Sequence, residues 1–317
     1  MKQRQGLAAV GFLAPNLAGF ALFTLGPVLV AAGLSFYKYQ LASGVSPEFT
    51  GLENFTRLIG FHHTPETGLE ANDPYFWQYL GNTMFLMLNI PLSMIGALIL
   101  AVQLNKPLKG RIAFRTLFFI PHLCSGVAIF MVWKMLLTYE PNVGIINGFL
   151  WNLYSLLGIP PERAIELLPG WLIDRNWAKP AIIIMFVWGA VGGFNMILYL
   201  AGLQNIPLEL YEAAEMDGAG WWPVLRNITI PMLAPTTFFI FVTSVIGGLQ
   251  GGFEAAYVMT QGGPEGSTTP VSYYIFTTAY ERLDIGYAAA ISMVLFALIF
   301  SVTLINWRFG GKKLEAS

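Results

Sequence analysis

Six long stretches without a charged residue constrain this chain more than any other feature. They lie at 7–37, 79–105, 116–133, 180–208, 227–253 and 285–307. A helix that crosses a bilayer needs about 20 mostly apolar residues, with about 17 as the lower limit. Every stretch reaches that limit. We therefore expect an all-α integral membrane protein with six transmembrane helices, forming a single transmembrane domain over 1–317.

The composition excludes several classes of protein. The chain is 55% hydrophobic and only 11% charged, whereas a soluble domain carries about 25% charged residues. Its net charge of −1 provides no basic surface for a nucleic acid. The first stretch is too long for the core of a signal peptide, so we expect it to remain as a helix.

Basic residues near the ends of the stretches predict the orientation. The expected spans cover approximately 10–37, 79–105, 113–138, 180–204, 232–257 and 285–308. The short segment 105–115 between the second and third spans carries four basic residues, Lys106, Lys109, Arg111 and Arg115. A cytoplasmic position for this segment also places both termini in the cytoplasm, including Lys312 and Lys313 near the C-terminus.

The expected outer segments differ in character. Segment 38–78 contains clusters of Pro, Gly, Asn and Asp and is predicted to be irregular, with a short helix at 51–59. Residues 144–158 are apolar but too short to span, which favours an amphipathic helix lying at the outer membrane interface. Gly pairs such as Gly192-Gly193 and Gly251-Gly252 interrupt spans, as close helix packing or kinks lining a solute path would require.

A polar island, Glu212-Ala213-Ala214-Glu215-Met216-Asp217-Gly218-Ala219, lies in the loop 205–231 between the fourth and fifth spans. Pro207 is suited to the start of a helix, and acidic residues in a first turn complement the helix dipole. Gly218 permits a sharp reversal of the chain. The loop therefore predicts two short helices tied to two membrane spans, with a small-residue face that can enter a cleft in another protein.

The island resembles the loop of binding-protein-dependent sugar permeases of ATP-binding-cassette (ABC) importers, of the maltose or glycerol-phosphate type. The matching residues are Tyr211-Glu212-Ala213-Ala214, Asp217-Gly218-Ala219 and Ile230-Pro231-x-Leu233, with Ile230 where such permeases usually have Leu. Further matches are Trp171-Leu172, Leu200-Ala201-Gly202-Leu203, the run from Tyr257 to Pro264, and Gly286-Tyr287-Ala288-Ala289-Ala290. The resemblance covers nearly the whole chain and is strongest over 170–300.

The resemblance implies a mechanism and a set of partners. It makes the loop 205–231 a cytoplasmic coupling helix that docks on an ATPase through Glu212, Ala213, Ala214, Asp217, Gly218 and Pro231. The implied partners are a second homologous permease, two ABC ATPases, an extracytoplasmic solute-binding protein and membrane lipids. ATP and magnesium belong to the ATPases, so no cofactor is expected in this chain. The implied location is the cytoplasmic membrane of a bacterium or archaeon.

Polar groups within membrane spans are costly and tend to face a cavity or the bundle interior. The candidates are Asn82, Asn89, Ser93, His122, Trp188, Asn195, Tyr199, Ser244, Gln250 and Glu254. The fourth and fifth spans offer hydrogen-bonding and aromatic groups suited to a sugar, namely Trp188, Phe194, Asn195, Gln250, Phe253 and Glu254. Packing between helices remains an equally good explanation for each of them. The uncharged spans favour a neutral carbohydrate; glycerol phosphate or a polyol is the alternative cargo.

Catalysis and ion-driven secondary transport are the two alternative functions. No phosphate-binding loop and no metalloprotease or hydrolase motif occurs, so neither catalytic residues nor a metal site are expected. The pair His62-His63 lacks a third ligand signal. A secondary transporter driven by an ion gradient would usually show internal repeats and ionisable residues within its spans. We find no fixed-period repeat, and the cores of the spans are almost free of charge, which favours the ABC importer. The sequence leaves open which sugar is carried.

Overall fold

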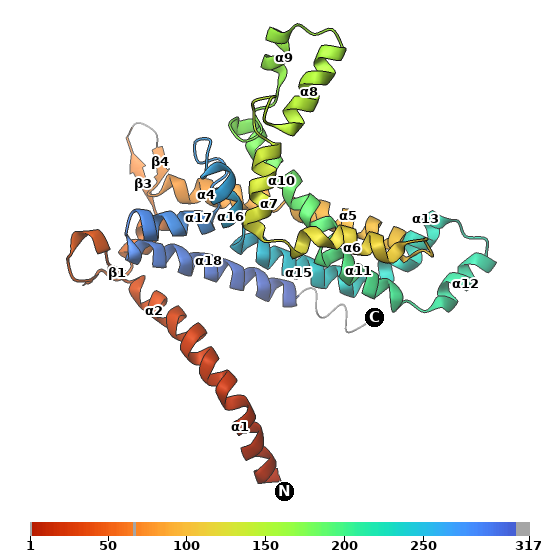
Figure 1. Ribbon diagram of the computed structural model, residues 1–317. Helices are drawn as coiled ribbons and strands as arrows, with labels where there is room; N and C mark the ends of the chain where they lie inside the picture. Colours follow the sequence, from red (N-terminus) through yellow and green to blue (C-terminus); the bar gives the residue numbers. More distant parts are fainter. Residues whose placement is uncertain (1, 66–67, 309–317) are drawn as a thin grey trace. The chain divides into compact units, whose positions relative to one another are not determined.

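The computed structural model describes residues 2–65 and 68–308, which are mostly helical (Figure 1). The chain divides into two compact units. Unit 1 comprises Met1–Trp77 and Tyr274–Leu298, and unit 2 comprises Gln78–Tyr273 and Ile299–Ser317. The single transmembrane domain over 1–317 therefore stays a prediction. Lys312 and Lys313, two of the basic residues that predict a cytoplasmic C-terminus, lie outside the described residues.

Unit 1 combines membrane-type helices with a small β-containing segment. Its elements are α1 (Lys2–Phe20), a π-helical turn (Ala21–Leu25), α2 (Gly26–Leu34), β1 (Tyr37–Lys38), β2 (Glu48–Phe49), α3 (Glu53–Ile59), β3 (Phe61–Thr64), β4 (Gly68–Ala71) and most of α18 (Ile285–Asn306). The short helix expected at 51–59 is present as α3. The prediction that the rest of segment 38–78 is irregular is wrong in part. Strand β1 pairs with β2, and β3 pairs with β4, and both pairs are antiparallel.

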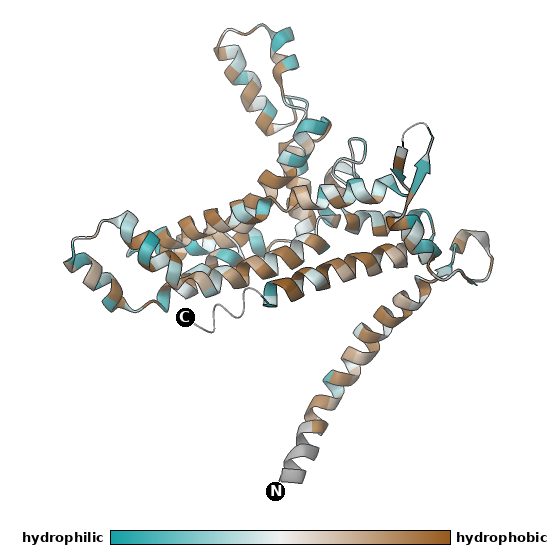
Figure 2. Ribbon diagram, turned by 180° about the vertical axis from the view of Figure 1, so that it is seen from behind, coloured by the Kyte–Doolittle hydropathy of each residue, from teal (hydrophilic) through white to brown (hydrophobic). Residues whose placement is uncertain are grey.

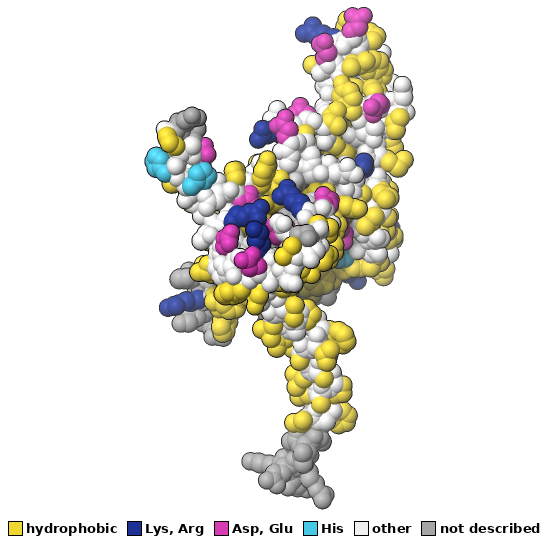
Figure 3. Space-filling view, turned by 90° about the vertical axis from the view of Figure 1, so that its left-hand side faces the viewer, with side chains coloured by type: hydrophobic (Ala, Val, Ile, Leu, Met, Phe, Trp, Pro, Cys, Tyr) yellow, Lys and Arg dark blue, Asp and Glu magenta, His cyan; other side chains and the backbone are white. Residues whose placement is uncertain are grey.

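The segment Val10–Leu34 is a long apolar helix that is not buried against the rest of the chain. Figure 3 shows hydrophobic side chains over its visible face, and the histidines on the hairpin formed by β3 and β4. An apolar surface of this kind is stable in a lipid environment or against another apolar surface. This helix therefore has the surface of a membrane-embedded element.

The lengths and compositions of the helices fit a multi-pass membrane protein. Among the described residues, four helices are long and apolar enough to cross a membrane: Val10–Leu34, Pro74–Asn105, Arg175–Gln204 and Ile285–Asn306. Two bent helix pairs bring the number to six if each pair is one span. In Figure 2 hydrophobic residues run along most of α18, while hydrophilic residues appear in the loop that contains α12.

Unit 2 is a helical assembly that carries the polar island. Its elements are most of α4 (Pro74–Leu86), α5 (Asn89–Asn105), α6 (Arg111–Leu123), α7 (Gly126–Leu136), α8 (Ile145–Leu156), α9 (Pro161–Leu167), α10 (Arg175–Val191), α11 (Phe194–Gln204), α12 (Leu208–Met216), α13 (Trp221–Val224), α14 (Ile230–Met232), α15 (Ala234–Gln250), α16 (Phe253–Ala255) and the first half of α17 (Val271–Phe276). The apolar segment predicted to be helical at 144–158 forms α8. The hydrophobic core of unit 2 includes Leu86, Leu137, Ile182, Met185 and Met259.

Two of the predicted spans contain sharp bends. The helices α6 and α7 meet at 96°, and the helical segment Trp221–Met232 meets α15 at 64°. The first bend falls at Cys124 and Ser125, whose extended backbone ends the helical hydrogen bonding. A Ser-Gly pair such as Ser125-Gly126 is a common place for a kink. The range 113–138 is therefore two helices in the structure.

A second break, between α10 and α11, packs directly against α6. A Cβ atom on Gly192 would collide with the carbonyl oxygen of Phe118, and one on Gly193 would lie 3.0 Å from Nδ1 of His122. Only glycine leaves room for so close an approach of α6. Across the α7–α10 contact, the indole rings of Trp133 and Trp188 meet edge to face at 5.6 Å. The two broken helices therefore break beside each other.

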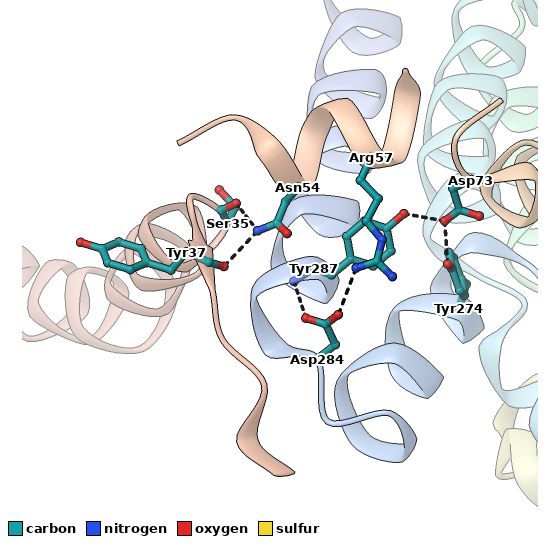
Figure 4. Close-up of polar contacts among 8 residues, drawn as sticks. All are labelled: Ser35, Tyr37, Asn54, Arg57, Asp73, Tyr274, Asp284 and Tyr287. Atoms are coloured by element: carbon teal, nitrogen blue, oxygen red, sulfur yellow. Dashed lines mark hydrogen bonds and ion pairs between the residues drawn. The ribbon is translucent and has the colours of Figure 1, made fainter. Parts of the chain in front are cut away.

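A buried carboxylate organises the polar interior of unit 1 (Figure 4). Asp73 is 6% exposed and uses both of its oxygens. Its Oδ1 accepts a hydrogen bond of 3.1 Å from the backbone N–H of Phe76 and caps α4. Its Oδ2 accepts from the hydroxyls of Tyr274, at 2.7 Å, and of Tyr287. Burial raises the pKa of the Tyr274 hydroxyl, and the hydrogen bond to Asp73 raises it further.

Further contacts attach the β-containing segment of unit 1 to the start of α18. The guanidinium of Arg57 lies 4.1 Å above the ring of Tyr287 and pairs with Asp284 at 3.4 Å. The Nδ2 of Asn54 donates to the carbonyls of Ser35 and Tyr37, each at 2.9 Å. Buried polar groups with full sets of partners fix one arrangement of the chain. These contacts therefore link α3 both to residues 35–37 and to the start of α18.

Replacing Asp73 tests the importance of this cluster. We expect Asp73→Ala to lower the free energy of unfolding by about 2–4 kcal/mol, because two buried hydroxyls lose a charged acceptor and α4 loses its cap. The measurement is unfolding of the purified chain in mixed micelles of increasing denaturing-detergent content. Asp174→Ala is the matched control, since Asp174 caps α10 on an exposed surface through the N–H of Asn176. A similar loss in both variants would show that the tyrosine hydroxyls contribute nothing.

Candidate functional site

The polar island forms α12 and the turn that follows it, at one end of α5 and α11 in unit 2 (Figure 1). Pro207 is the N-cap residue, and α12 begins at Leu208 with Glu209 in its first turn. Proline suits the entry to a helix because its fixed φ angle is preorganised and its missing N–H is not needed there. The acidic first turn complements the positive end of the helix dipole.

Gly218 ends α12 in a specific hydrogen-bonded turn. Its φ is 72°, in the left-handed region that favours glycine. The N–H of Gly218 donates to the carbonyl of Glu215 at 3.0 Å, and the N–H of Ala219 donates to that of Ala214 at 2.9 Å. These two bonds form a Schellman motif. The space around Gly218 is open, so the requirement for glycine here is one of backbone conformation.

The outer surface of this loop is exposed and small. Glu212, Ala213, Asp217 and Gly218 are exposed, and Ala214 is half-buried. The loop's most exposed large hydrophobic side chain is Met216, at 89%. An exposed methionine beside alanines and carboxylates gives a mixed apolar and acidic surface, which suits docking on another protein. Pro231 is also exposed but lies in α14, beyond the second helix of the loop.

The inner side of α12 is bound to the end of the same loop, just before α14. The hydroxyl of Tyr211 in α12 lies 3.2 Å from Oγ1 of Thr229, which is 5% exposed. Beneath the loop lies a cavity of about 310 Å³, whose lining includes Lys106 at the end of α5, Leu203 of α11 and Trp221 of α13. The loop thus lines one cavity together with the ends of α5 and α11 and is continuous in sequence with α11 and α15, so a displacement of α12 can reach both of these helices.

Two neighbouring cavities lie deeper in unit 2. The first measures about 300 Å³ and is lined by α4, α5, α10, α11 and α15. Its polar residues are Thr83, Asn89, Ser93, Asn195 and Ser244. The second measures about 390 Å³ and lies at the breaks in the helices, with Pro121, His122, Cys124, Gly126 and Phe194 in its lining. Phe186, Ala190 and Asn195 line both cavities.

The structure brings together only some of the residues predicted for the solute path. Asn195 lines both cavities, and Phe194 lines the second. Trp188 meets Trp133 edge to face and is 48% exposed. Gln250 is exposed at the end of α15, adjacent to Gly251 and Gly252 of the first cavity.

The last two predicted residues lie in α16. The ring of Phe253 stacks on Tyr257 at 5.7 Å and lies 5.9 Å from the ring of Tyr273. Glu254 is exposed and lies beside Gly126, which lines the second cavity. The six residues therefore divide into two that line cavities and four that lie around or beyond their margins.

The first cavity is also lined by residues that were not among the six predicted for the solute path. Asn89, Ser93 and Ser244 belonged to the wider set of polar residues within spans and line the first cavity. Thr83 and Phe186 were not singled out, because one threonine or phenylalanine in an apolar run gives no signal. By contrast, Asn82 is held by the backbone: its Nδ2 donates to the carbonyls of Gly266 and Thr269. Within 2–65 and 68–308, no three His, Cys, Asp or Glu residues cluster closely enough to hold a metal ion.

The chain is similar to several transport proteins over nearly its whole length. It is 36% identical over 301 residues to the lactose transport system permease protein LacF of Rhizobium radiobacter, covering 93% of this chain and 91% of the relative. It is 31% identical to the arabinooligosaccharides transport system permease protein AraP of Bacillus subtilis, covering 95% of this chain and 87% of that protein.

Solved structures show the same fold. A chain in the crystal structure of a bacterial ABC transporter involved in the import of the acidic polysaccharide alginate matches with a TM-score of 0.73 at 25% identity, covering 97% of each chain. A chain of a bacterial alginate ABC transporter in complex with an alginate pentasaccharide-bound periplasmic protein matches with a TM-score of 0.75 at 22% identity, covering 96% of this chain and 93% of that one.

The family assignment follows from the sequence match together with the fold. Residues 89–310, which contain the α12 loop, the lining of the second cavity, most of the lining of the first and all six residues predicted for the solute path, match one family of transport proteins. The resemblance inferred from the polar island is thereby confirmed. This chain belongs to the family of binding-protein-dependent transport system inner membrane components and is a multi-pass permease subunit.

Proposed function

We propose that this chain is one of two permease subunits of an ATP-driven importer that carries a neutral carbohydrate across the cytoplasmic membrane of a bacterium or archaeon. A solute-binding protein delivers the carbohydrate from outside, and two ABC ATPases bind from the cytoplasm. The observation that carries the proposal is the exposed α12 surface, held by the Schellman turn at Gly218. Relatives whose names specify lactose and arabinooligosaccharides support a carbohydrate cargo.

The proposed topology has six spans and places both termini in the cytoplasm. Each bent helix pair counts as one span, which raises the four continuous candidates to six. The basic residues of segment 105–115 are then cytoplasmic, as the distribution of Lys and Arg requires. This topology also places α12 in the cytoplasm, since it follows the fourth span.

In the proposed coupling step, α12 lies in a groove of an ATPase. Glu212 faces a basic residue there, while Ala213 and Ala214 allow close approach. Movement of the ATPase displaces α12. The displacement reaches the spans through the chain connection to α11 and through the hydrogen bond to Thr229, which lies in the segment before α15. The cavities around Asn195 then change their access from one side of the membrane to the other.

The proposed solute path runs through the two cavities. Their linings combine hydroxyl and amide groups with the rings of Phe186 and Phe194 and contain neither lysine nor arginine. Hydrogen-bonding groups and aromatic faces suit a sugar, whereas an anionic solute would usually be given a cationic partner. This composition supports a neutral sugar over glycerol phosphate.

Reversing one charge on α12 tests the coupling surface. We expect Glu212→Lys to reduce co-purification of the ATPase and ATP-dependent uptake by about tenfold or more, because an interfacial ion pair becomes a repulsion. Glu166→Lys is the matched control, as Glu166 is equally an exposed glutamate but lies on α9. Unchanged co-purification and uptake in Glu212→Lys would remove α12 from the ATPase interface.

A glycine pair tests the turn itself. We expect Gly218→Ala to destabilise the end of α12 by about 1–2 kcal/mol, because an alanine is strained at this positive φ. Gly220→Ala is the control, since Gly220 has a φ of −71° and only ordinary contacts around an added Cβ. Hydrogen exchange of the α12 amides measures the difference. Equal protection in the two variants would contradict the conformational requirement at Gly218.

Asn195 tests the solute path. We expect Asn195→Ala to raise the KM for uptake about tenfold, because the side chain lines both cavities and its loss removes hydrogen bonds to the sugar. Asn82→Ala gives the contrasting result, a loss of stability, since its amide holds backbone carbonyls. An unchanged KM in a stable, correctly assembled Asn195→Ala importer would place the path elsewhere.

A further inference from the structure

The second cavity, at the breaks of the helices, adjoins a helix end that would ordinarily attract anions. Gly126 lines the cavity and is the first residue of α7, which has 11 residues. The first N–H groups of a helix have no partner within it and carry the positive end of its dipole. Ser125, the N-cap residue, makes no side-chain hydrogen bond to them. Anions bind readily at such ends.

A carboxylate of the chain itself lies at this place. A Cβ atom added to Gly126 would lie 2.6 Å from Oε2 of Glu254 and 3.8 Å from its Cδ. Glu254 reaches this position from α16, which begins immediately after Gly252, where a φ of 86° turns the chain out of α15. The negative charge therefore lies beside the start of α7 and at the margin of the cavity.

The remaining charges near α7 do not offset this carboxylate at the cavity. The ammonium group of Lys134 lies in the last turn of α7 and donates to the carbonyl of Val258 at 3.0 Å. Neither Lys nor Arg lines the second cavity, and its titratable side chains are His122 and Cys124. Among the residues next to Gly126, Glu254 is thus the one that carries a full charge.

We propose that Glu254 sets the charge selectivity of the solute path: its carboxylate lies against Gly126 at the margin of the second cavity, so the negative potential there favours neutral saccharides and disfavours acidic ones. This inference rests on the proposed function and names the class of solute. It makes Glu254 a specificity-determining residue. It also predicts a difference in cargo from the structurally similar transporter of alginate, which is an acidic polysaccharide.

The chain contains its own reporter of this charge. Cys124 is its single cysteine, is exposed, and lines the same cavity two residues before Gly126. Methanethiosulfonate reagents with anionic, neutral and cationic groups modify one thiol at rates that depend on the local potential. We would measure the three rates by mass spectrometry on the full-length chain in nanodiscs of zwitterionic lipid. Each rate is divided by the rate of the neutral reagent, which corrects for access.

Glu254→Gln is expected to raise the ratio of anionic to neutral rates about three- to tenfold and to lower the ratio of cationic to neutral rates. Glu254→Asp, which keeps the charge, and Glu265→Gln, which removes an exposed carboxylate paired with Arg175, are expected to leave both ratios unchanged. Unchanged ratios in Glu254→Gln would overturn the inference. An equal change in all three rates would do so too, since it would indicate altered access rather than altered potential.

A separate uptake measurement distinguishes this inference from the proposed function. The complete importer is supplied with a neutral galactose disaccharide or with digalacturonate, each with wild-type chain and with Glu254→Gln. A smaller preference for the neutral disaccharide in Glu254→Gln supports the inference. A wild-type importer that prefers digalacturonate contradicts the proposed neutral cargo, whereas an unchanged preference for the neutral disaccharide in an active variant contradicts only the role of Glu254.

Discussion

The need to satisfy every backbone hydrogen bond in a medium without water governs this structure. Lipid offers no partners for free N–H and C=O groups, so a spanning chain must be helical wherever it faces lipid. Irregular backbone is tolerated only where it is buried or lines a cavity. The breaks follow this rule: Cys124 and Gly126, Phe194 and Asn195, and Gly251 and Gly252 all line one of the two cavities. The breaks thus adjoin the two cavities through which we propose that the solute passes.

The same constraint explains why the α12 loop is conspicuous. Its carboxylates, its exposed methionine and its glycine turn would be costly within a bilayer but suit a surface that another protein contacts. The Schellman turn and the bond between Tyr211 and Thr229 keep the loop rigid. Rigidity matters because a flexible loop would absorb a displacement rather than pass it to α11 and α15.

The helical class, the apolar spans and the polar island could be predicted from the sequence, because each depends on local composition and residue spacing. The bend between α6 and α7 did not, since Ser125-Gly126 is compatible with both a straight and a broken helix. The buried cluster around Asp73 joins residues some 200 positions apart in sequence, which no local pattern reveals. Asn195 was foreseen as a polar residue within a span, whereas the position of Glu254 at the start of α7 required the three-dimensional structure.

Reconstituted uptake shows whether this chain works in an ATP-driven importer. Vesicles containing this chain and the proposed partner permease and ATPases are supplied with the proposed solute-binding protein and a radiolabelled neutral oligosaccharide. We expect the sugar to accumulate only when ATP, the ATPases and the binding protein are all present, and an ion gradient to have no effect. Accumulation driven by an ion gradient in vesicles containing this chain alone would contradict this expectation.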